Sequence, residues 1–283
     1  MDAGKRIAAL GQSLGPDVLQ AVRNLFNDEQ DGLAASRPAS AADIAYGPHE
    51  RHRLDLYTPA DAKAAPVLVF VHGGGFLKGD KGHDGAGGWP NANVGRMAAA
   101  VGFVGVVINY RLAPDHMWPA GPQDVAAAVD WLKAHVADHG GDPDRIVLAG
   151  TSAGAVHVAG YLKLARTGAI RGAILLSGLY GYTPLDERDT LYYGDPALYA
   201  DRMPLEAVAA IDLPLFVACA QHDPARFQQE FFSLMQDRVA RHGTMPRAMI
   251  LSGHNHYSMP MHIGTADRRL ADAICAFVRD TTI

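Results

Sequence analysis

The stretch RIVLAGTSAG, residues 145–154, joins a short apolar run to a glycine-flanked serine and decides the fold class. Residues 145–149 have the apolar, β-branched character of a strand that is buried on both faces. The next residues carry Ser152 between small neighbours, and a helical pattern begins there. A serine hydroxyl is a weak nucleophile, so it must be displayed on a tight turn where a base can reach it. The stretch therefore predicts a strand, a sharp turn that exposes Ser152, and a helix.

Apolar runs and helical patterns alternate on both sides of this stretch. Helical spacing is seen, for example, at Val125, Val129 and Leu132. Because strand and helix alternate along most of the chain, we predict an α/β fold with a mostly parallel sheet and helices on both faces. The predicted strands are residues 66–71, 102–108, 145–149, 172–176, 213–218 and 247–251.

Two segments depart from the alternation. Residues 1–45 have a weakly helical pattern, and residues 178–212 form an irregular stretch rich in Tyr and Pro. A long irregular insertion in a compact domain usually serves a function, although a plain surface loop is the alternative. We expect one main domain, residues 46–283, with a small cap-like insertion at about 178–212, preceded by a helical segment, residues 1–45.

Composition narrows the classes of partner. The chain has 283 residues, with 25 Lys and Arg against 30 Asp and Glu, and no basic run that would suit a nucleic acid. Cys219 and Cys275 lie in apolar stretches and are expected to be buried, reduced thiols. Because no apolar run reaches the roughly 20 residues of a membrane span or forms a signal-peptide core, we expect a soluble, cytoplasmic protein. The sequence leaves the oligomeric state open, a homodimer included.

A second glycine-rich motif, HGGGF at residues 72–76, directly follows a predicted strand. Acyl transfer builds negative charge on a substrate oxygen, and backbone N–H groups can stabilise it where glycines let the backbone come close. The candidate donors are the N–H groups of Gly74 and Gly75, together with that of Ala153 just after the serine. A plain flexible turn is the alternative interpretation of three glycines.

An acid and a base are expected on loops that follow later strands. Asp223 follows the predicted strand 213–218, and the motif GHNHY at 253–257 offers His254 and His256 after the strand 247–251. Such residues on surface loops are ordinarily just solvated. Here both loops lie beyond the carboxyl ends of predicted strands, where sheets of this class bind their ligands. The chain order Ser, Asp, His also suits a hydrolase triad.

The histidine-rich segment also invites a metal interpretation. His254, His256 and His262 lie close in sequence, but no cluster of Cys or acidic residues accompanies them. Zinc sites usually need three or four ligands with an oriented second shell. We therefore expect no metal and no cofactor. His83 and Asp84 receive no role.

Three motifs together resemble a known family. HGGGF, YRLAP at 110–114 and GTSAG at 150–154 are similar to motifs of the hormone-sensitive-lipase-like branch of carboxylesterases, and the resemblance runs from about Asp43 to the C-terminus. It implies the α/β-hydrolase fold, an ester hydrolase, and a cap built from residues 1–45 and the stretch after Gly178. Our first interpretation is a serine carboxylesterase that hydrolyses small, fairly apolar esters through an acyl-enzyme. The residues that the resemblance implies are a triad of Ser152, Asp223 and His256 and oxyanion donors Gly74, Gly75 and Ala153.

Two departures from the family pattern widen the choice of function. Thr151 stands where many relatives have Asp, and residues 1–45 are short for a full helical cap. Both features suit the similar arylformamidases, which use the same triad on a formyl amide. A third interpretation is a non-catalytic binder, as the gibberellin receptors of plants are. Those receptors have lost the catalytic histidine, whereas this sequence keeps a candidate.

Spacing does not choose between the two histidines, which lie 31 and 33 positions after Asp223. We predict that His256 is the base, because Tyr257 and Ser258 follow it in a way that resembles the family's catalytic histidine. His256 also lies nearer the final helix, which leaves residues 253–255 to span from the strand to the site. His254 would then orient the loop or face solvent.

Overall fold

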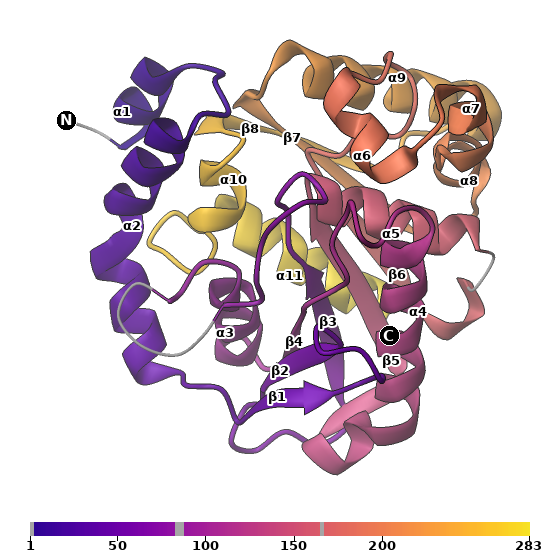
Figure 1. The fold of residues 1–283 in the computed structure, drawn as a ribbon. Coiled ribbons are helices and arrows are strands. Elements are labelled where there is room, and N and C mark those ends of the chain that lie inside the picture. Colours follow the sequence, from indigo (N-terminus) through magenta and orange to yellow (C-terminus); the bar gives the residue numbers. More distant parts are fainter. Residues whose placement is uncertain (1–2, 83–87, 165–166) are drawn as a thin grey trace.

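The computed structural model of the chain describes residues 3–82, 88–164 and 167–283 and is built around one sheet (Figure 1). Within the described residues, eight strands are hydrogen-bonded in the order β1-β2-β4-β3-β5-β6-β7-β8. β2 runs antiparallel to both neighbours, and every pairing from β4 to β8 is parallel. The predicted α/β class and all six predicted strands are confirmed. The strands are β1 Ala41–Ala45, β2 Arg53–Tyr57, β3 Ala65–Val71, β4 Val104–Ile108, β5 Gly141–Thr151, β6 Gly172–Leu176, β7 Leu215–His222 and β8 Arg247–Asn255.

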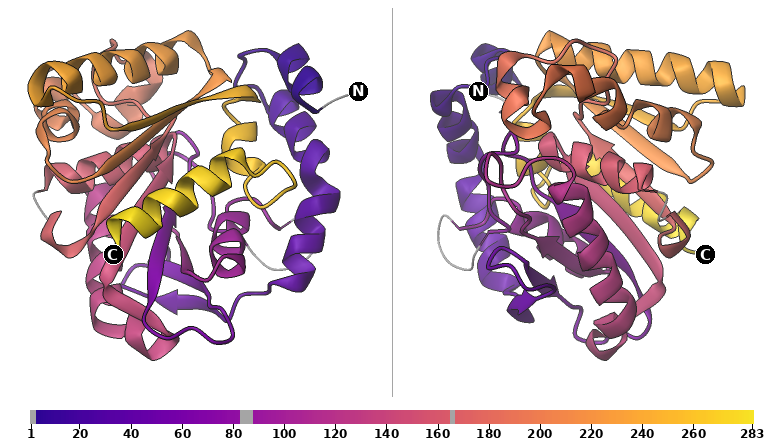
Figure 2. Two further views of the ribbon diagram at one scale, coloured as in Figure 1. Left: turned by 180° about the vertical axis from the view of Figure 1, so that it is seen from behind. Right: turned by 45° about the vertical axis from the view of Figure 1, so that its right-hand side comes forward.

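Helices cover both faces of the sheet, and β3 shows why its sequence is apolar throughout. Val69 and Val71 belong to one core cluster and Leu68 and Phe70 to the other, because successive side chains of a strand point to opposite faces. The first face carries α4 (Ala120–His135), α5 (Ala153–Lys163) and α9 (Ala225–His242), and the second carries α3 (Ala92–Ala100) and α11 (Arg269–Thr281) (Figure 2). Two short 3-10 helices, η1 (Val136–His139) and η2 (Thr167–Ala169), lie between these elements. None of the helices in the described residues is long and apolar enough to cross a membrane.

The N-terminal segment is helical over a shorter range than its pattern predicts. Helices α1 (Ala3–Leu10) and α2 (Pro16–Ser36) form, but residues 41–45 are the edge strand β1, so the prediction of a helical segment through residue 45 is wrong at its end. The reason is Pro38, which disfavours helical backbone at the residue before it. Arg37 accordingly has φ −139° and ψ 66°.

The antiparallel strand β2 was not predicted because a carboxylate lies in the middle of it. Asp55 is buried, and it is neutralised by Lys81, whose Nζ lies 2.8 Å from Asp55 Oδ1. The residue that neutralises this carboxylate comes from a distant loop. The local pattern of apolar residues therefore does not reveal that a charged residue can be buried in this strand.

The segment after β6 folds into short helical turns that lie near the carboxyl end of the sheet (Figure 1). Tyr192, Tyr193 and Met203 from this insertion pack in one cluster with Phe76 of the HGGGF motif and with Ala153. The insertion therefore contacts both glycine motifs. Its elements are η3 (Glu187–Asp189), α6 (Thr190–Tyr193), η4 (Pro196–Leu198), α7 (Tyr199–Arg202) and α8 (Leu205–Ala210).

Helix α1 packs against β8, and α2 runs down the outside of the molecule along α10 and α3 (Figure 1). Val22 and Phe26 form a cluster with Trp89, against which Tyr257 and Met261 also pack. The Tyr257 hydroxyl donates a hydrogen bond of 2.7 Å to the Leu14 carbonyl. The N-terminal segment is thus attached to the loop that follows His256 and to α10 (Ser258–Met261).

Candidate active site

Ser152 occupies a strained turn between β5 and α5. Its φ of 54° and ψ of −122° lie in a region that residues with a side chain rarely adopt, which costs on the order of 1–3 kcal/mol. The turn needs glycine at 154, because a Cβ there would overlap the carbonyl oxygen of Val71. Such strain persists only where surrounding structure enforces it, and it projects the serine beyond the end of the sheet. The predicted strand, turn and helix are all present.

The HGGGF loop lies directly against this turn. A Cβ built on Gly73 would be 3.2 Å from the Cβ of Ser152. Gly74 and Gly75 both have positive φ values, 131° and 60°, and a Cβ on Gly74 would overlap the Lys78 carbonyl oxygen. The loop therefore takes a path open only to glycine, and it brings its backbone beside the serine.

The YRLAP motif holds the loop in place. The Tyr110 hydroxyl donates to the His72 carbonyl at 2.9 Å, and the Ala113 N–H donates to the Phe76 carbonyl at 3.0 Å. The His72 ring stacks on the Tyr110 ring with centroids 4.4 Å apart. Burial lowers the pKa of His72 to about 4, so this imidazole is neutral and serves as a support. The two motifs are one structural unit.

Asp223 and His256 are brought together beyond β7 and β8. His256 Nδ1 lies 2.7 Å from Asp223 Oδ1, and both side chains are buried. Because an ionised carboxylate only accepts, Nδ1 carries the proton, and Nε2 of the neutral ring is then a proton acceptor. The Phe227 ring, 4.4 Å away between centroids, packs against the imidazole.

Further donors hold the other oxygen of Asp223. Its Oδ2 accepts hydrogen bonds from Ser177 Oγ at 2.6 Å and from the Ala220 N–H at 2.7 Å, with Cys219 Sγ at 3.2 Å. Burial alone would raise the pKa of Asp223, but the bonds from His256, Ser177 and Ala220 together outweigh it and lower that pKa. The carboxylate is therefore ionised at neutral pH and fixed in orientation.

The end of β6 connects the serine turn with the acid. The Ser152 N–H donates to the Leu176 carbonyl at 2.9 Å, and the next residue, Ser177, binds Asp223. Ser177 was not predicted as a site residue, because nothing in its local sequence marks it. Its one signal is its position at the carboxyl end of a predicted strand.

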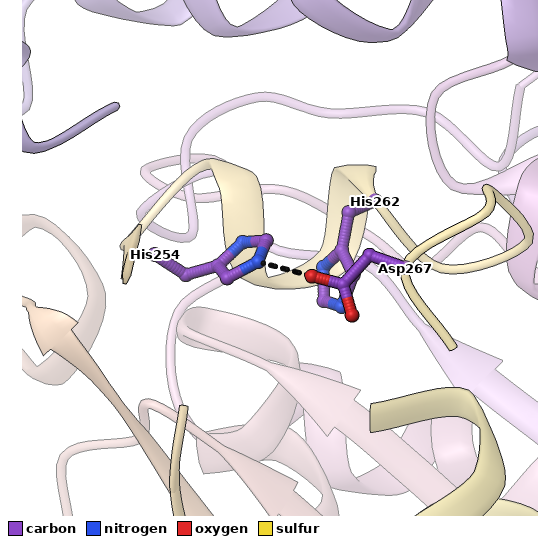
Figure 3. Close-up of side chains that lie close together, drawn as sticks. All are labelled: His254, His262 and Asp267. Carbon is purple, nitrogen blue, oxygen red and sulfur yellow. Dashed lines mark hydrogen bonds and ion pairs between the residues drawn. The ribbon is translucent and has the colours of Figure 1, made fainter. Parts of the chain in front are cut away.

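His254 has a different environment from His256. Its Nε2 lies 3.1 Å from Asp267 Oδ2 (Figure 3). Its Nδ1 lies 3.0 Å from Ser258 Oγ, so both ring nitrogens have partners. Burial lowers its pKa. His254 therefore holds the loop, in line with the orienting role that the sequence suggested for it.

Among the residues that the structure describes, one group could hold a metal ion. Ligand atoms of His254, His262 and Asp267 all lie within 4.8 Å of one another (Figure 3). The sequence showed no cluster of Cys or acidic residues beside these histidines, but folding brings one acidic residue, Asp267, to them. The Arg269 guanidinium already binds this carboxylate, at 2.5 Å from Oδ2 and 2.9 Å from Oδ1. Its charge would oppose that of a cation at the same oxygens.

The other residues singled out in the sequence are the two cysteines, His83, Asp84 and the predicted site residues. Cys219 and Cys275 are buried and free, as predicted. His83 and Asp84 lie outside the described residues. The HGGGF loop, which carries Gly74 and Gly75, meets the serine turn through Gly73, and Ala153 directly follows Ser152. Asp223 and His256 meet at the ends of β7 and β8.

Comparisons with known proteins point to one class of enzyme. The BD-FAE family model matches residues 54–169. The chain is 30% identical over 258 residues to the probable carboxylic ester hydrolase LipM of Mycobacterium tuberculosis, which covers 76% of this chain and 58% of LipM. It is 35% identical over 193 residues to carboxylesterase NlhH of the same species, covering 57% of each.

The chain thus spans a little over half the length of these two curated relatives. The solved structure of EstE1, a thermophilic carboxylesterase cloned from a metagenomic library, superposes with a TM-score of 0.72 at 22% identity. It covers 94% of this chain and 98% of EstE1, and at that identity it supports the fold.

Proposed function

We propose that the chain is a serine carboxylesterase of the hormone-sensitive-lipase-like branch of the α/β-hydrolase superfamily, with Ser152, His256 and Asp223 as its triad. The observation that carries the proposal is the His256–Asp223 pair of 2.7 Å, at the same edge of the sheet as the strained serine turn. A hydrolase needs a nucleophile, a base and a group that orients the base, and these are the three.

In the proposed reaction, His256 Nε2 takes the proton of Ser152 Oγ as that oxygen attacks the ester carbonyl carbon. The imidazolium then gives this proton to the departing alkoxide, and the acyl group stays on the serine. Water, deprotonated by the same imidazole, releases the acid and regenerates Ser152. Asp223 remains ionised and stabilises the imidazolium, as its lowered pKa requires.

The negative oxygen of the tetrahedral intermediate is bound by the backbone N–H groups of Gly74, Gly75 and Ala153 in this proposal. The loop of Gly74 and Gly75 lies against the serine turn, and Ala153 begins α5. A preorganised donor of this kind is typically worth about 10²- to 10³-fold in kcat.

Residues 178–212 and α1–α2 act as the cap in this proposal, and they favour small substrates. Phe76 and Tyr192 stack at 4.1 Å between centroids, and Tyr193 packs edge-on against both rings. The region between the HGGGF loop and the insertion is thus filled with aromatic side chains, and a long acyl chain that entered it would have to displace them.

We therefore expect the best turnover on acetyl to butyryl esters. Their kcat/KM should exceed that on a dodecanoyl ester by at least about tenfold, because overpacking costs binding energy in the transition state. A series of p-nitrophenyl esters measures this. A higher kcat/KM on the dodecanoyl ester than on the butyryl ester would contradict the proposed cap.

An arylformamidase is the second candidate. The observation that favours it is the row of aromatic rings beside the HGGGF loop, in which Trp118 stacks on Tyr193 with centroids 6.2 Å apart. Aromatic rings offer faces on which an aryl substrate can stack. The same ester series run beside an aryl formamide separates the two, because an arylformamidase should prefer the amide in kcat/KM.

A metal takes no part in the proposed reaction. Dialysis against EDTA should therefore leave kcat/KM on p-nitrophenyl acetate unchanged, because the serine, the imidazole and the backbone donors supply all the steps. The measurement is the rate before and after dialysis, with metal content determined in parallel. A loss of activity that returns with Zn²⁺ would instead assign a working metal to His254, His262 and Asp267.

A further inference from the structure

Arg188, on the short turn η3 of the insertion, lies on the HGGGF loop. A Cβ built on Gly75 would overlap Nη2 of Arg188 and would lie 3.3 Å from its Cζ. The guanidinium thus contacts the backbone of a proposed oxyanion donor, while the residue as a whole stays exposed to solvent.

The acidic neighbours of Arg188 bind another cation. Asp186 and Asp189 both pair with Arg226, at 2.8 and 2.6 Å. Among the described residues, no hydrogen bond or ion pair is found for the Arg188 side chain. The Arg188 guanidinium therefore carries an unpaired positive charge beside Gly75, in a protein whose net charge is −5.

The charge of Arg188 also acts on the histidine loop. Burial raises the pKa of Tyr257, the residue after His256, and the Arg188 guanidinium partly opposes that rise. Arg188 thus touches the HGGGF loop at Gly75 and acts electrostatically on Tyr257, next to His256.

We propose that Arg188 binds a carboxylate of the substrate, so that the esters this protein prefers carry one anionic group near the scissile bond. The inference rests on the proposed esterase function and narrows its substrate class. A planar guanidinium offers two parallel N–H donors that match the two oxygens of a carboxylate, and its single charge matches a monoanion.

Two other roles for Arg188 make different predictions. A guanidinium that stabilised the oxyanion would accelerate neutral and anionic esters alike, because both develop the same charge. A merely solvated surface arginine would leave the kinetics of both unchanged. The ratio of kcat/KM for an anionic ester to that for a neutral ester of the same shape therefore isolates carboxylate binding.

Two substrate pairs place the carboxylate on either side of the ester. On the acyl side, monoethyl succinate carries a carboxylate where ethyl levulinate carries a neutral acetyl group. 4-Acetoxybenzoate and 4-acetoxyacetophenone differ in the same way on the alcohol side. The variants are Arg188→Gln, Arg188→Lys and Arg188→Glu, and Glu187→Gln is the matched control on the same exposed turn.

For at least one pair, Arg188→Gln should lower the anionic-to-neutral ratio by about ten- to a hundredfold, the range typical of a charge-assisted hydrogen bond. Arg188→Lys should retain part of the ratio, Arg188→Glu should lower it further, and Glu187→Gln should leave it unchanged. In the wild type, added salt should lower the same ratio.

Ratios that stay the same in Arg188→Gln for both pairs would overturn the inference, and so would an equal loss on both members of each pair. In either case turnover of the neutral esters by the wild type would leave the proposed function standing. A wild type that hydrolyses none of the four esters would overturn the proposed function itself.

Discussion

Replacing Ser152 with alanine is expected to lower kcat on p-nitrophenyl acetate by about 10⁴-fold or more, because a triad acts as a unit and loses nearly all its effect with any member. Alanine at φ 54° is as strained as serine, so the thermal midpoint should change little. Stopped-flow or steady-state rates, together with thermal unfolding, measure both quantities.

A second variant separates chemistry from strain. Ser152→Gly should lose activity to the same degree as Ser152→Ala, yet it should unfold at a higher temperature, because glycine adopts a positive φ without steric cost. A folded Ser152→Ala variant that keeps more than about a tenth of the wild-type kcat would show that Ser152 is not the nucleophile.

Replacing His256 with alanine should reduce kcat as severely as replacing Ser152, because no other group is positioned to take the serine proton in the proposed mechanism. His256 Nδ1 is held by Asp223 at 2.7 Å, which leaves Nε2 as its basic atom. The measurement is kcat on p-nitrophenyl acetate across pH 5 to 9.

His254→Ala is the matched control for this variant, since it removes a buried imidazole two residues away. Its loss in kcat should be at most about tenfold, because His254 binds Asp267 and Ser258 and acts through the loop. Its thermal midpoint should fall, since Asp267 loses a partner. The opposite kinetic pattern, with His254→Ala inactive and His256→Ala active, would transfer the role of base to His254.

Local sequence was sufficient for the parts of the site that are contiguous in the chain. The ten residues 145–154 predict the strand, the turn at Ser152 and the start of the helix. The buried apolar residues of the strand, the small residues of the turn and the strained serine all lie within this stretch. The loop of Gly74 and Gly75 is similarly self-contained, since consecutive glycines at the end of a strand encode a close backbone approach.

Contacts between distant segments could not be predicted in this way. Ser177 meets Asp223 across 46 positions, and Lys81 neutralises Asp55 across 26. Asp267 joins His254 and His262 only after the chain has turned through α10 and the loop that follows. Arg188 reaches Gly75 from an insertion whose sequence has no periodicity. Each of these pairings depends on tertiary structure, which cannot be predicted from hydrophobic periodicity and composition.

Covalent labelling tests the central claim, that Ser152 is the acyl-accepting nucleophile, most directly. The purified protein is treated with a fluorophosphonate, digested, and examined by mass spectrometry. The account predicts one adduct per chain, on the peptide that carries Ser152, and no adduct in Ser152→Ala. Labelling on a different residue, or no labelling of a folded wild type, would contradict it and would favour a non-catalytic binder on this fold.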